Sequence, residues 1–139
     1  MELGMIGLGR MGGDMTRRLL QGGHRVVVYD PLKTARGAAA AHGAAATISV
    51  KELVSALKSP RIIWLMVPAG KPTEDTIDKL LPLLSDGDIV IDGGNSNYND
   101  SIRRAEKLAN SGIFFMDVGT SGGIWGLKEG YCLMVGGDV

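Results

Sequence analysis

The sequence predicts an α/β protein with a doubly wound, mainly parallel sheet and helices on both of its faces. Short apolar runs rich in Val and Ile alternate along the 139 residues with runs of helical character. The first apolar run ends in a glycine-rich turn, and later runs end in loops rich in Gly, Asn, Ser or Pro. Because ligands of open α/β sheets bind at the carboxyl ends of the strands, these loops predict a ligand site along one edge.

The glycine-rich turn, residues 7–12, has the pattern G-x-G-x-x-G and lies between a predicted strand, residues 3–6, and a predicted helix. Gly7 permits a tight turn, Gly9 lets the backbone approach a pyrophosphate, and Gly12 lets the helix pack closely on the strand. The free N–H groups and the dipole at the start of the helix favour phosphate. Alone, the same pattern also fits an ordinary glycine-rich turn between a strand and a helix.

A second apolar run, residues 24–29, contains three consecutive valines and predicts a buried parallel strand. Asp30 follows it, roughly 20 residues beyond the glycine turn, where an acid can accept hydrogen bonds from an adenosine ribose. The alternative is a solvated aspartate in a turn before proline. Together with the glycine turn, Asp30 favours a Rossmann-type domain, residues 1–139, that binds NAD rather than NADP, because a carboxylate repels a 2′-phosphate. Lys33 and Arg36 are the nearby cations that would oppose this preference.

The other elements follow from apolar periodicity and from capping residues. Ser49 begins a capping box for a short helix, and Thr73 is expected to cap the helix that follows it. The last long helix would bury Ile102 and Leu108 and expose a charged run that includes Arg104. The predicted helices span residues 13–21, 33–42, 50–57, 74–84 and 100–110, and the predicted strands span residues 3–6, 24–29, 61–67, 89–92, 113–118 and 131–135.

The composition argues against several classes of function. The 15 basic and 15 acidic residues give a net charge of zero, with no basic stripe for a nucleic acid. No apolar run is long enough to cross a bilayer, and the N-terminus begins with a strand instead of a signal peptide, so we expect a cytoplasmic protein without a membrane partner. His24 and His42 are isolated and Cys132 is the single cysteine, so we expect neither a metal site nor an internal disulfide. The apolar run around Cys132 favours a buried thiol.

Four loops fall at the expected ligand edge, namely residues 7–12, 67–70, 92–98 and 119–123. Their glycines and short polar side chains suit a polar or anionic ligand, because backbone N–H groups can converge on it. These loops hold no Ser–His–acid or Cys–His set, and no Lys or Glu lies in apolar surroundings that would tune it for proton transfer. The nearest pair, Lys128-Glu129, lies in a predicted surface turn at residues 126–130. The sequence therefore predicts cofactor binding and part of a substrate site, without acid–base catalysis.

Four motifs carry a resemblance to a known family: GLGRMG at residues 7–12, MVPAG at 66–70, DGGNSNY at 92–98 and SGG at 121–123. Over its whole length the chain resembles the 6-phosphogluconate dehydrogenases, which are decarboxylating members of the β-hydroxyacid dehydrogenase superfamily. DGGNSNY is the specific motif, since relatives such as 3-hydroxyisobutyrate dehydrogenase usually carry a different loop there. The VPAG form resembles a shorter, NAD-preferring branch, and many members carry a lysine at the position of Pro68.

The resemblance implies that 6-phosphogluconate is oxidised at C3 by a nicotinamide cofactor and then loses CO2 to give ribulose 5-phosphate in the pentose phosphate pathway. It also implies that the catalytic base, a lysine, and the acid, a glutamate, lie beyond Val139 in a helical domain that forms a homo-oligomer, so the chain alone would be inactive. Two alternatives stay open. One is another β-hydroxyacid dehydrogenase, such as a 3-hydroxyisobutyrate dehydrogenase or an imine-reductase-like protein; the other is a non-catalytic NAD-binding module. The implied cofactor-binding residues are Gly7, Leu8, Gly9, Arg10, Met11, Gly12, Asp30, Val67, Pro68, Ala69 and Asn95, and the implied substrate-binding residues are Asn95, Ser121, Gly122 and Gly123.

Overall fold

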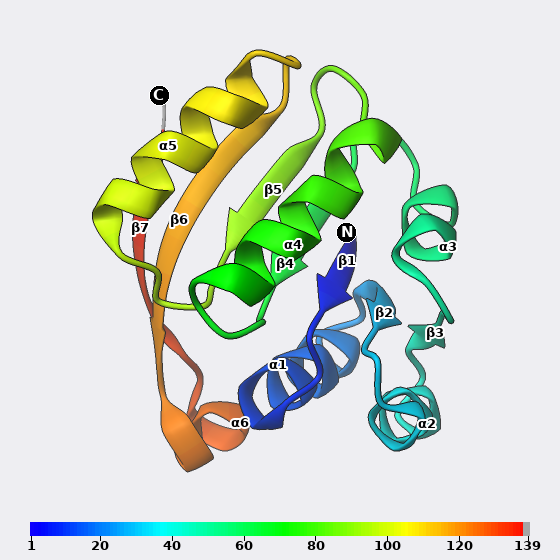
Figure 1. Cartoon of the computed structure of the whole chain (residues 1–139). Helices are drawn as coiled ribbons and strands as arrows, with labels where there is room; N and C mark the ends of the chain where they lie inside the picture. The colour runs from blue at the N-terminus through cyan, green and yellow to red at the C-terminus, as the bar shows by residue number, and fades with distance from the viewer. Residues whose placement is uncertain (138–139) are drawn as a thin grey trace.

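Seven strands form one sheet in the order β3-β2-β1-β4-β5-β6-β7 (Figure 1). The computed structural model describes residues 1–137; Asp138 and Val139, the last two residues of the predicted domain, lie outside the described residues. The strands are β1 (Glu2–Ile6), β2 (Arg25–Tyr29), β3 (Ala45–Ala46), β4 (Ile62–Leu65), β5 (Ile89–Asp92), β6 (Phe114–Ser121) and β7 (Cys132–Gly137). The helices are α1 (Arg10–Gln21), α2 (Lys33–Ala41), α3 (Val50–Ser55), α4 (Lys71–Leu80), α5 (Tyr98–Ala109) and α6 (Gly126–Glu129), with 3-10 turns η1 (Leu81–Leu83) and η2 (Gly123–Trp125).

The sheet reverses its winding direction at β1, which pairs in parallel with β2 on one side and with β4 on the other. The chain winds outward from β1 through β2 to β3, then returns across β1 and winds the other way through β4, β5 and β6. Such a reversal opens a crevice at the carboxyl ends of the two central strands. Only the last pairing of the described sheet, between β6 and β7, is antiparallel. The predicted doubly wound, mainly parallel sheet is confirmed.

Helices cover both faces of the sheet, with α3, α4 and α5 on one face and α1, α2 and α6 on the other (Figure 1). Alternation along each strand supplies both cores, because successive side chains point to opposite faces. In β2, Val27 packs on the side of α3 and α4, whereas Val26 and Val28 pack on the side of α1 and α2. Burial on both faces explains why the strands are continuous apolar runs in the sequence. Among residues 1–137, no helix has the length and apolar character needed to cross a membrane.

The helix starts show which capping predictions hold. Ser49 Oγ accepts a backbone N–H of α3 at 3.0 Å, as predicted. The prediction for Thr73 is wrong: Gly70 is the N-cap of α4, and Thr73 is buried inside the helix, where its hydroxyl donates to the Pro68 carbonyl at 2.9 Å. The helix begins earlier than expected because Pro72 suits the first helical turn, where no N–H partner is needed.

Three other segments differ from the prediction. The expected loop at residues 119–123 is partly strand, because β7 pairs with residues 119–121 and extends β6, so that Ser121 lies opposite Cys132. The expected surface turn at residues 126–130 forms the short helix α6. The strand β3 was not predicted, because two alanines carry no β-branched or aromatic signal.

Burial corrects three side-chain predictions. Cys132 is exposed, because β7 is an edge strand whose six residues are all exposed. On α5 the buried face runs through Ser101, Arg104 and Leu108, so Leu108 is buried as expected. Ile102 is 55% exposed, whereas Arg104 is fully buried. Burying an arginine costs desolvation free energy and is tolerated only when its charge is paired. The partners of Arg104 lie behind the ligand edge of the sheet.

Candidate functional site

A cleft of about 800 Å³ opens at the carboxyl ends of the central strands, where the sheet reverses its winding. Its walls come from segments far apart in the sequence: the glycine turn, the end of β2, the loop after β4 with α4, and the loop after β5. This is the usual place for a ligand in an open α/β sheet. The implied cofactor residues that line the cleft are Gly7, Gly9, Arg10, Met11, Gly12, Asp30, Val67, Pro68 and Asn95.

The glycine turn has the geometry that close approach of a pyrophosphate requires. Gly7 has a φ of 98°, and a Cβ there would lie 2.4 Å from the Met66 carbonyl oxygen. A Cβ on Gly12 would lie 2.0 Å from the Gly7 carbonyl oxygen, so α1 packs on the end of β1 only with glycine at this position. A Cβ on Gly9 would have no heavy atom of residues 1–137 within 4 Å, apart from those of the two residues next to it in the chain. The backbone at Gly9 is therefore open toward a ligand. No described side chain caps α1 before Arg10, which leaves its first N–H groups for an anion.

Asp30 faces the cleft from the end of β2, and its carboxylate also organises the glycine turn. Oδ2 accepts the N–H of Leu8 at 2.8 Å, and Oδ1 accepts the N–H of Leu32 at 2.8 Å. A carboxylate offers about four lone-pair positions, so about two are left for ribose hydroxyls. Arg36 Nη1 donates to the carbonyl oxygens of Asp30 at 2.8 Å and Pro31 at 3.0 Å, which directs this cation to the backbone between β2 and α2. Leu8, an implied cofactor residue, is buried and contributes through its backbone bond to Asp30.

Asn95 reaches the cleft from the loop after β5. Its φ of 57° is uncommon for a residue with a side chain. Its amide is bound to β6, because Oδ1 accepts the N–H of Thr120 at 3.1 Å and Nδ2 lies 3.4 Å from the Thr120 carbonyl oxygen. One N–H and one lone pair of the amide are left for a ligand. The contact joins the cleft to the end of β6.

Several implied residues lie outside the cleft wall. Ala69 is in the loop between β4 and α4, and Ser121 is the last residue of β6. Gly122 and Gly123 follow directly, at the turn into η2. Because Asn95 binds the residue before Ser121, the end of β6 lies next to the cleft, and the implied cofactor and substrate residues are neighbours.

Tyr131 and Arg18 hold the turn after β6. A Cβ on Gly122 would lie 2.8 Å from the Tyr131 ring, and a Cβ on Gly126 would lie 2.1 Å from it, so the ring packs directly on the backbone of the turn. Burial raises the pKa of Tyr131, and the phenol stays protonated at neutral pH. Arg18 on α1 donates to the Leu127 carbonyl oxygen at 3.0 Å. The end of β6 is thereby fixed relative to α1, whose first turn lines the cleft.

A buried ion-pair network lies behind the cleft wall. Arg104 on α5 and Asp92 at the end of β5 are both fully buried, and Arg104 Nη1 lies 3.3 Å from Asp92 Oδ2. Arg104 Nε donates to Glu74 Oε1 on α4 at 2.6 Å. Burial by itself raises the pKa of Glu74, but hydrogen bonds and charges of Arg103 and Arg104 together hold that pKa below its ordinary value of 4.5. The sequence did not predict this network, because the charged run on α5 is typical of a solvated face. The available signal was the position of Arg104, one helical turn before the buried Leu108.

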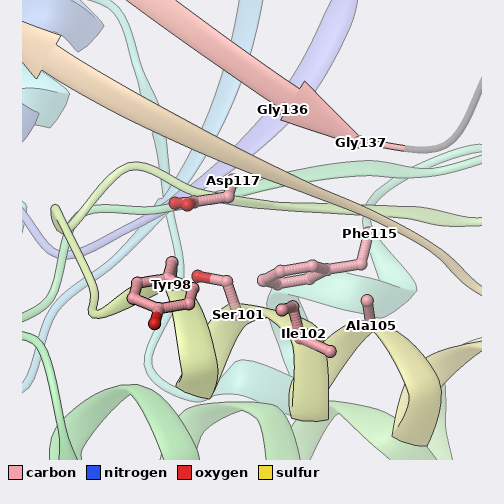
Figure 2. A pocket seen from close by; sticks show the side chains of 8 residues that line it. All are labelled: Tyr98, Ser101, Ile102, Ala105, Phe115, Asp117, Gly136 and Gly137. Carbon is pink, nitrogen blue, oxygen red and sulfur yellow. The ribbon is translucent and has the colours of Figure 1, made fainter.

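A second, smaller hollow of about 280 Å³ lies between α5 and the strands β6 and β7 (Figure 2). Tyr98 and Ile102 line it from α5, and Phe115 and Asp117 line it from β6. Its lining is largely apolar, and it shares no residue with the glycine turn. We place the candidate site in the larger cleft, because backbone donors, a carboxylate and an amide converge there. Within residues 1–137, no three His, Cys, Asp or Glu side chains are grouped to hold a metal ion.

The fold and the cleft together define a Rossmann-type dinucleotide-binding domain, because an open glycine turn, a helix N-terminus and an acid after β2 meet at the reversal point of the sheet. The protein-family model described as the NAD binding domain of 6-phosphogluconate dehydrogenase matches residues 2–139 of the sequence. The chain therefore belongs to the family of NAD-binding domains of 6-phosphogluconate dehydrogenase.

Individual relatives agree with this assignment. A protein of Haloferax volcanii, named as an NAD(+)-dependent, decarboxylating 6-phosphogluconate dehydrogenase, is 48% identical over 137 residues, which cover 99% of this chain and 45% of that protein. The 6-phosphogluconate dehydrogenase of Plasmodium falciparum, solved with NADP+ and with 6-phosphogluconate, matches with a TM-score of 0.90 and 30% identity over 99% of this chain and 31% of its own. The 3-hydroxyisobutyrate dehydrogenase of Mycobacterium tuberculosis matches with a TM-score of 0.88 and 29% identity over 99% of this chain and 46% of its own. The chain spans about half the length, or less, of the curated relatives it matches.

Proposed function

We propose that the chain is the cofactor-binding domain of an NAD-dependent, decarboxylating 6-phosphogluconate dehydrogenase. The observation that carries the proposal is that the glycine turn, Asp30 and Asn95 line one cleft. The family match supports the proposal that the cleft binds a dinucleotide. The DGGNSNY motif of residues 92–98 supports the proposal that the substrate is 6-phosphogluconate. The whole protein would oxidise 6-phosphogluconate at C3 and release CO2 to give ribulose 5-phosphate, a step of the pentose phosphate pathway.

Bound NAD would accept the hydride, and this chain would bind and orient the reactants. The N–H groups at the start of α1 would hold the pyrophosphate, and Asp30 would accept hydrogen bonds from the adenosine ribose. Met11 and the loop after β4 would border the nicotinamide. Asn95 and Ser121 would orient the substrate by hydrogen bonds. The base and the acid of the reaction, a lysine and a glutamate, would come from a further helical domain that also forms the homo-oligomer.

A second candidate is a 3-hydroxyisobutyrate dehydrogenase or another β-hydroxyacid dehydrogenase, which the match to the Mycobacterium tuberculosis structure favours. Both candidates would use the same dinucleotide cleft and would differ in the loop after β5. Assaying the whole protein with 6-phosphogluconate and with 3-hydroxyisobutyrate separates them. A non-catalytic NAD-binding module would bind NAD and convert neither substrate.

The cofactor preference can be measured on this chain by isothermal titration with NAD and NADP. We expect NADP to bind at least about tenfold more weakly, because about 1.4 kcal/mol of repulsion between Asp30 and a 2′-phosphate already gives that ratio. Asp30→Asn removes the charge and should bring the affinities for NAD and NADP closer together. Its NH2 group would also face the N–H of Leu8 or Leu32, so both affinities should fall, and the ratio of the two is the quantity to compare. Equal or tighter binding of NADP by the wild-type chain would contradict the assignment of NAD.

The chain alone is expected to bind NAD without oxidising 6-phosphogluconate. Proton removal from the C3 hydroxyl needs a base within hydrogen-bond reach, and fixing the substrate against the cofactor contributes about 7–11 kcal/mol of the barrier. The assay follows NADH absorbance with purified chain, NAD and 6-phosphogluconate, and the whole protein serves as the positive control. Sustained NADH formation by the chain alone would show that the catalytic groups lie within it.

A further inference from the structure

We infer that Arg104 is a positioning residue that holds the two cleft loops, residues 67–70 and 93–97, in the arrangement that binds the dinucleotide. This role rests on the proposed function of the cleft. The side chain is fully buried behind the cleft wall, and it is not among the residues that line the cleft. It therefore acts through the loops and not by contact with the ligand.

The guanidinium of Arg104 has partners on four segments, namely β5, the loop after β5, the loop after β4, and α4. Nη1 donates to Ser96 Oγ at 2.9 Å and to Asp92 Oδ2 at 3.3 Å. Nε donates to Glu74 Oε1 at 2.6 Å, and Nη2 lies 3.4 Å from the Gly70 carbonyl oxygen. Ser96 belongs to the loop after β5, whereas Gly70 and Glu74 belong to the loop after β4 and to α4. One side chain thus joins both loops of the cleft.

Asp92 folds the loop after β5 and depends on Arg104 to do so. Its Oδ1 accepts the N–H of Gly94 at 2.9 Å, and its Oδ2 accepts the Ser96 hydroxyl at 2.5 Å. A fully buried carboxylate is tolerated when it is both hydrogen-bonded and paired with a cation. Arg104 supplies the cation, so the turn that presents Asn95 to the cleft requires it.

The two loops also touch each other. A Cβ on Gly94 would lie 2.5 Å from the Val67 carbonyl oxygen, so the backbones of the loops are in direct contact. Val67 and Asn95 both line the cleft. A shift of residues 93–97 would therefore alter both loop walls of the cleft.

The fork of the guanidinium is essential to this arrangement. Lysine would keep the positive charge near Asp92, but a single ammonium nitrogen on a flexible stem cannot reproduce the directed bonds from Nη1 and Nε. Replacement by lysine therefore separates the pairing of a buried charge from the positioning of the loops.

The test compares Arg104→Lys, Ser96→Ala and the control Arg103→Gln in the 139-residue chain. Arg103 is the adjacent residue and is exposed. It binds the same Glu74 at 2.7 Å and Asp100 at 3.3 Å, and within residues 1–137 it has no hydrogen bond to the loop of residues 93–97. The measurements are NAD affinity by isothermal titration, backbone 15N relaxation of residues 93–97 without ligand, and the thermal unfolding midpoint.

Ser96→Ala removes the hydroxyl that binds both Arg104 Nη1 and Asp92 Oδ2 and leaves the ion pairs of Arg104 with Glu74 and Asp92, so its unfolding temperature should fall less than that of Arg104→Lys. We expect Ser96→Ala and Arg104→Lys to increase the mobility of residues 93–97 and to weaken NAD binding about tenfold. Arg103→Gln should leave both quantities unchanged. If Arg104 had only a structural role, Arg104→Lys would lower the unfolding midpoint, and Ser96→Ala would leave loop mobility and NAD affinity unaltered.

The inference would be overturned if both test variants, Arg104→Lys and Ser96→Ala, had the same loop mobility and the same NAD affinity as the control Arg103→Gln. Where Arg104→Lys fails to fold, Ser96→Ala decides by the same two measurements. A wild-type chain that does not bind NAD would overturn the proposed function, whereas the relaxation data on the ligand-free chain would still decide whether Arg104 and Ser96 order the loop.

Discussion

Replacing Gly12 with alanine is expected to lower the stability of the chain and to remove most of its affinity for NAD. The added Cβ would lie 2.0 Å from the Gly7 carbonyl oxygen and 3.1 Å from the Met66 Cβ. The first of these neighbours is backbone at the tight turn, so it cannot rotate away, and α1 must move away from the end of β1. Overpacking of this kind costs about 1–3 kcal/mol of unfolding free energy.

The effect of Gly12→Ala on binding follows from the same movement. The first turn of α1 carries the N–H groups that face the cleft, and a displaced helix no longer directs them to a pyrophosphate. We expect NAD affinity to fall by at least about tenfold, which corresponds to the loss of about 1.4 kcal/mol of binding free energy. Chemical denaturation measures the stability, and isothermal titration measures the binding.

Gly13→Ala is the matched control for this change. Among residues 1–137, and apart from its chain neighbours and the backbone of α1, a Cβ on Gly13 would have only the Leu8 carbonyl oxygen within 4 Å, at 3.5 Å, which is an ordinary contact. Alanine is favoured over glycine inside a helix by up to about 1 kcal/mol, so Gly13→Ala should stabilise the chain and leave NAD affinity unchanged. Equal behaviour of the two variants would show that close packing at Gly12 does not set the position of α1.

The sequence predicts well those parts of the fold that are determined by residues close together in the chain. Three consecutive valines in β2 are buried on both faces of the sheet, so an apolar run was a sufficient signal. The roles predicted for Gly7 and Gly12 in turning and close packing agree with the backbone contacts at these positions. The use of these residues and Asp30 by a cofactor stays a prediction.

The parts that the sequence does not predict depend on contacts between distant segments. The burial of Arg104 requires Glu74 and Asp92, which lie on two other elements, and periodicity alone predicted that the apolar Ile102 would be buried instead. The exposure of Cys132 follows from the position of β7 at the edge of the sheet, which an apolar run cannot reveal. In the candidate site the same limit applies to Asn95, whose amide is held by β6.

Replacing Asp88 with asparagine is expected to reduce stability strongly without changing NAD affinity. Asp88 is fully buried at the start of β5 and accepts three hydrogen bonds: from the Arg61 N–H at 2.7 Å, from Arg61 Nη1 at 3.0 Å and from the Ser85 N–H at 2.8 Å. Asparagine has the same shape, but its NH2 group would face donors. Hydrogen bonds to a charged group contribute about 1.5–3 kcal/mol each, so we expect the unfolding free energy at pH 7 to fall by about 3 kcal/mol.

The position of Asp88 separates this effect from binding. The cleft lies at the other end of β5, beyond Asp92, about 13 Å along the strand. NAD affinity, measured by titration well below the unfolding temperature, should therefore equal that of the wild-type chain. Asp86→Asn is the control, because Asp86 is an exposed neighbour in the same turn, and it should leave both stability and binding nearly unchanged.

The loss caused by Asp88→Asn should also depend on pH. Burial alone raises the pKa of Asp88, but the backbone N–H groups of Arg61 and Ser85 and the Arg61 guanidinium together hold that pKa below its ordinary value of 3.8. A carboxyl whose pKa is lower in the folded state stabilises the protein above its unfolded pKa, and this contribution disappears as the pH falls through the folded pKa. The stability difference between wild type and Asp88→Asn should therefore be largest near neutral pH. It should begin to shrink below about pH 4, where the carboxyl of the unfolded chain becomes protonated, and should disappear as the pH falls through the lower pKa of the folded protein. Denaturation curves of both proteins across this range measure the difference directly, and a difference that stays constant down to the lowest pH at which both fold would show that the charge of Asp88 contributes nothing.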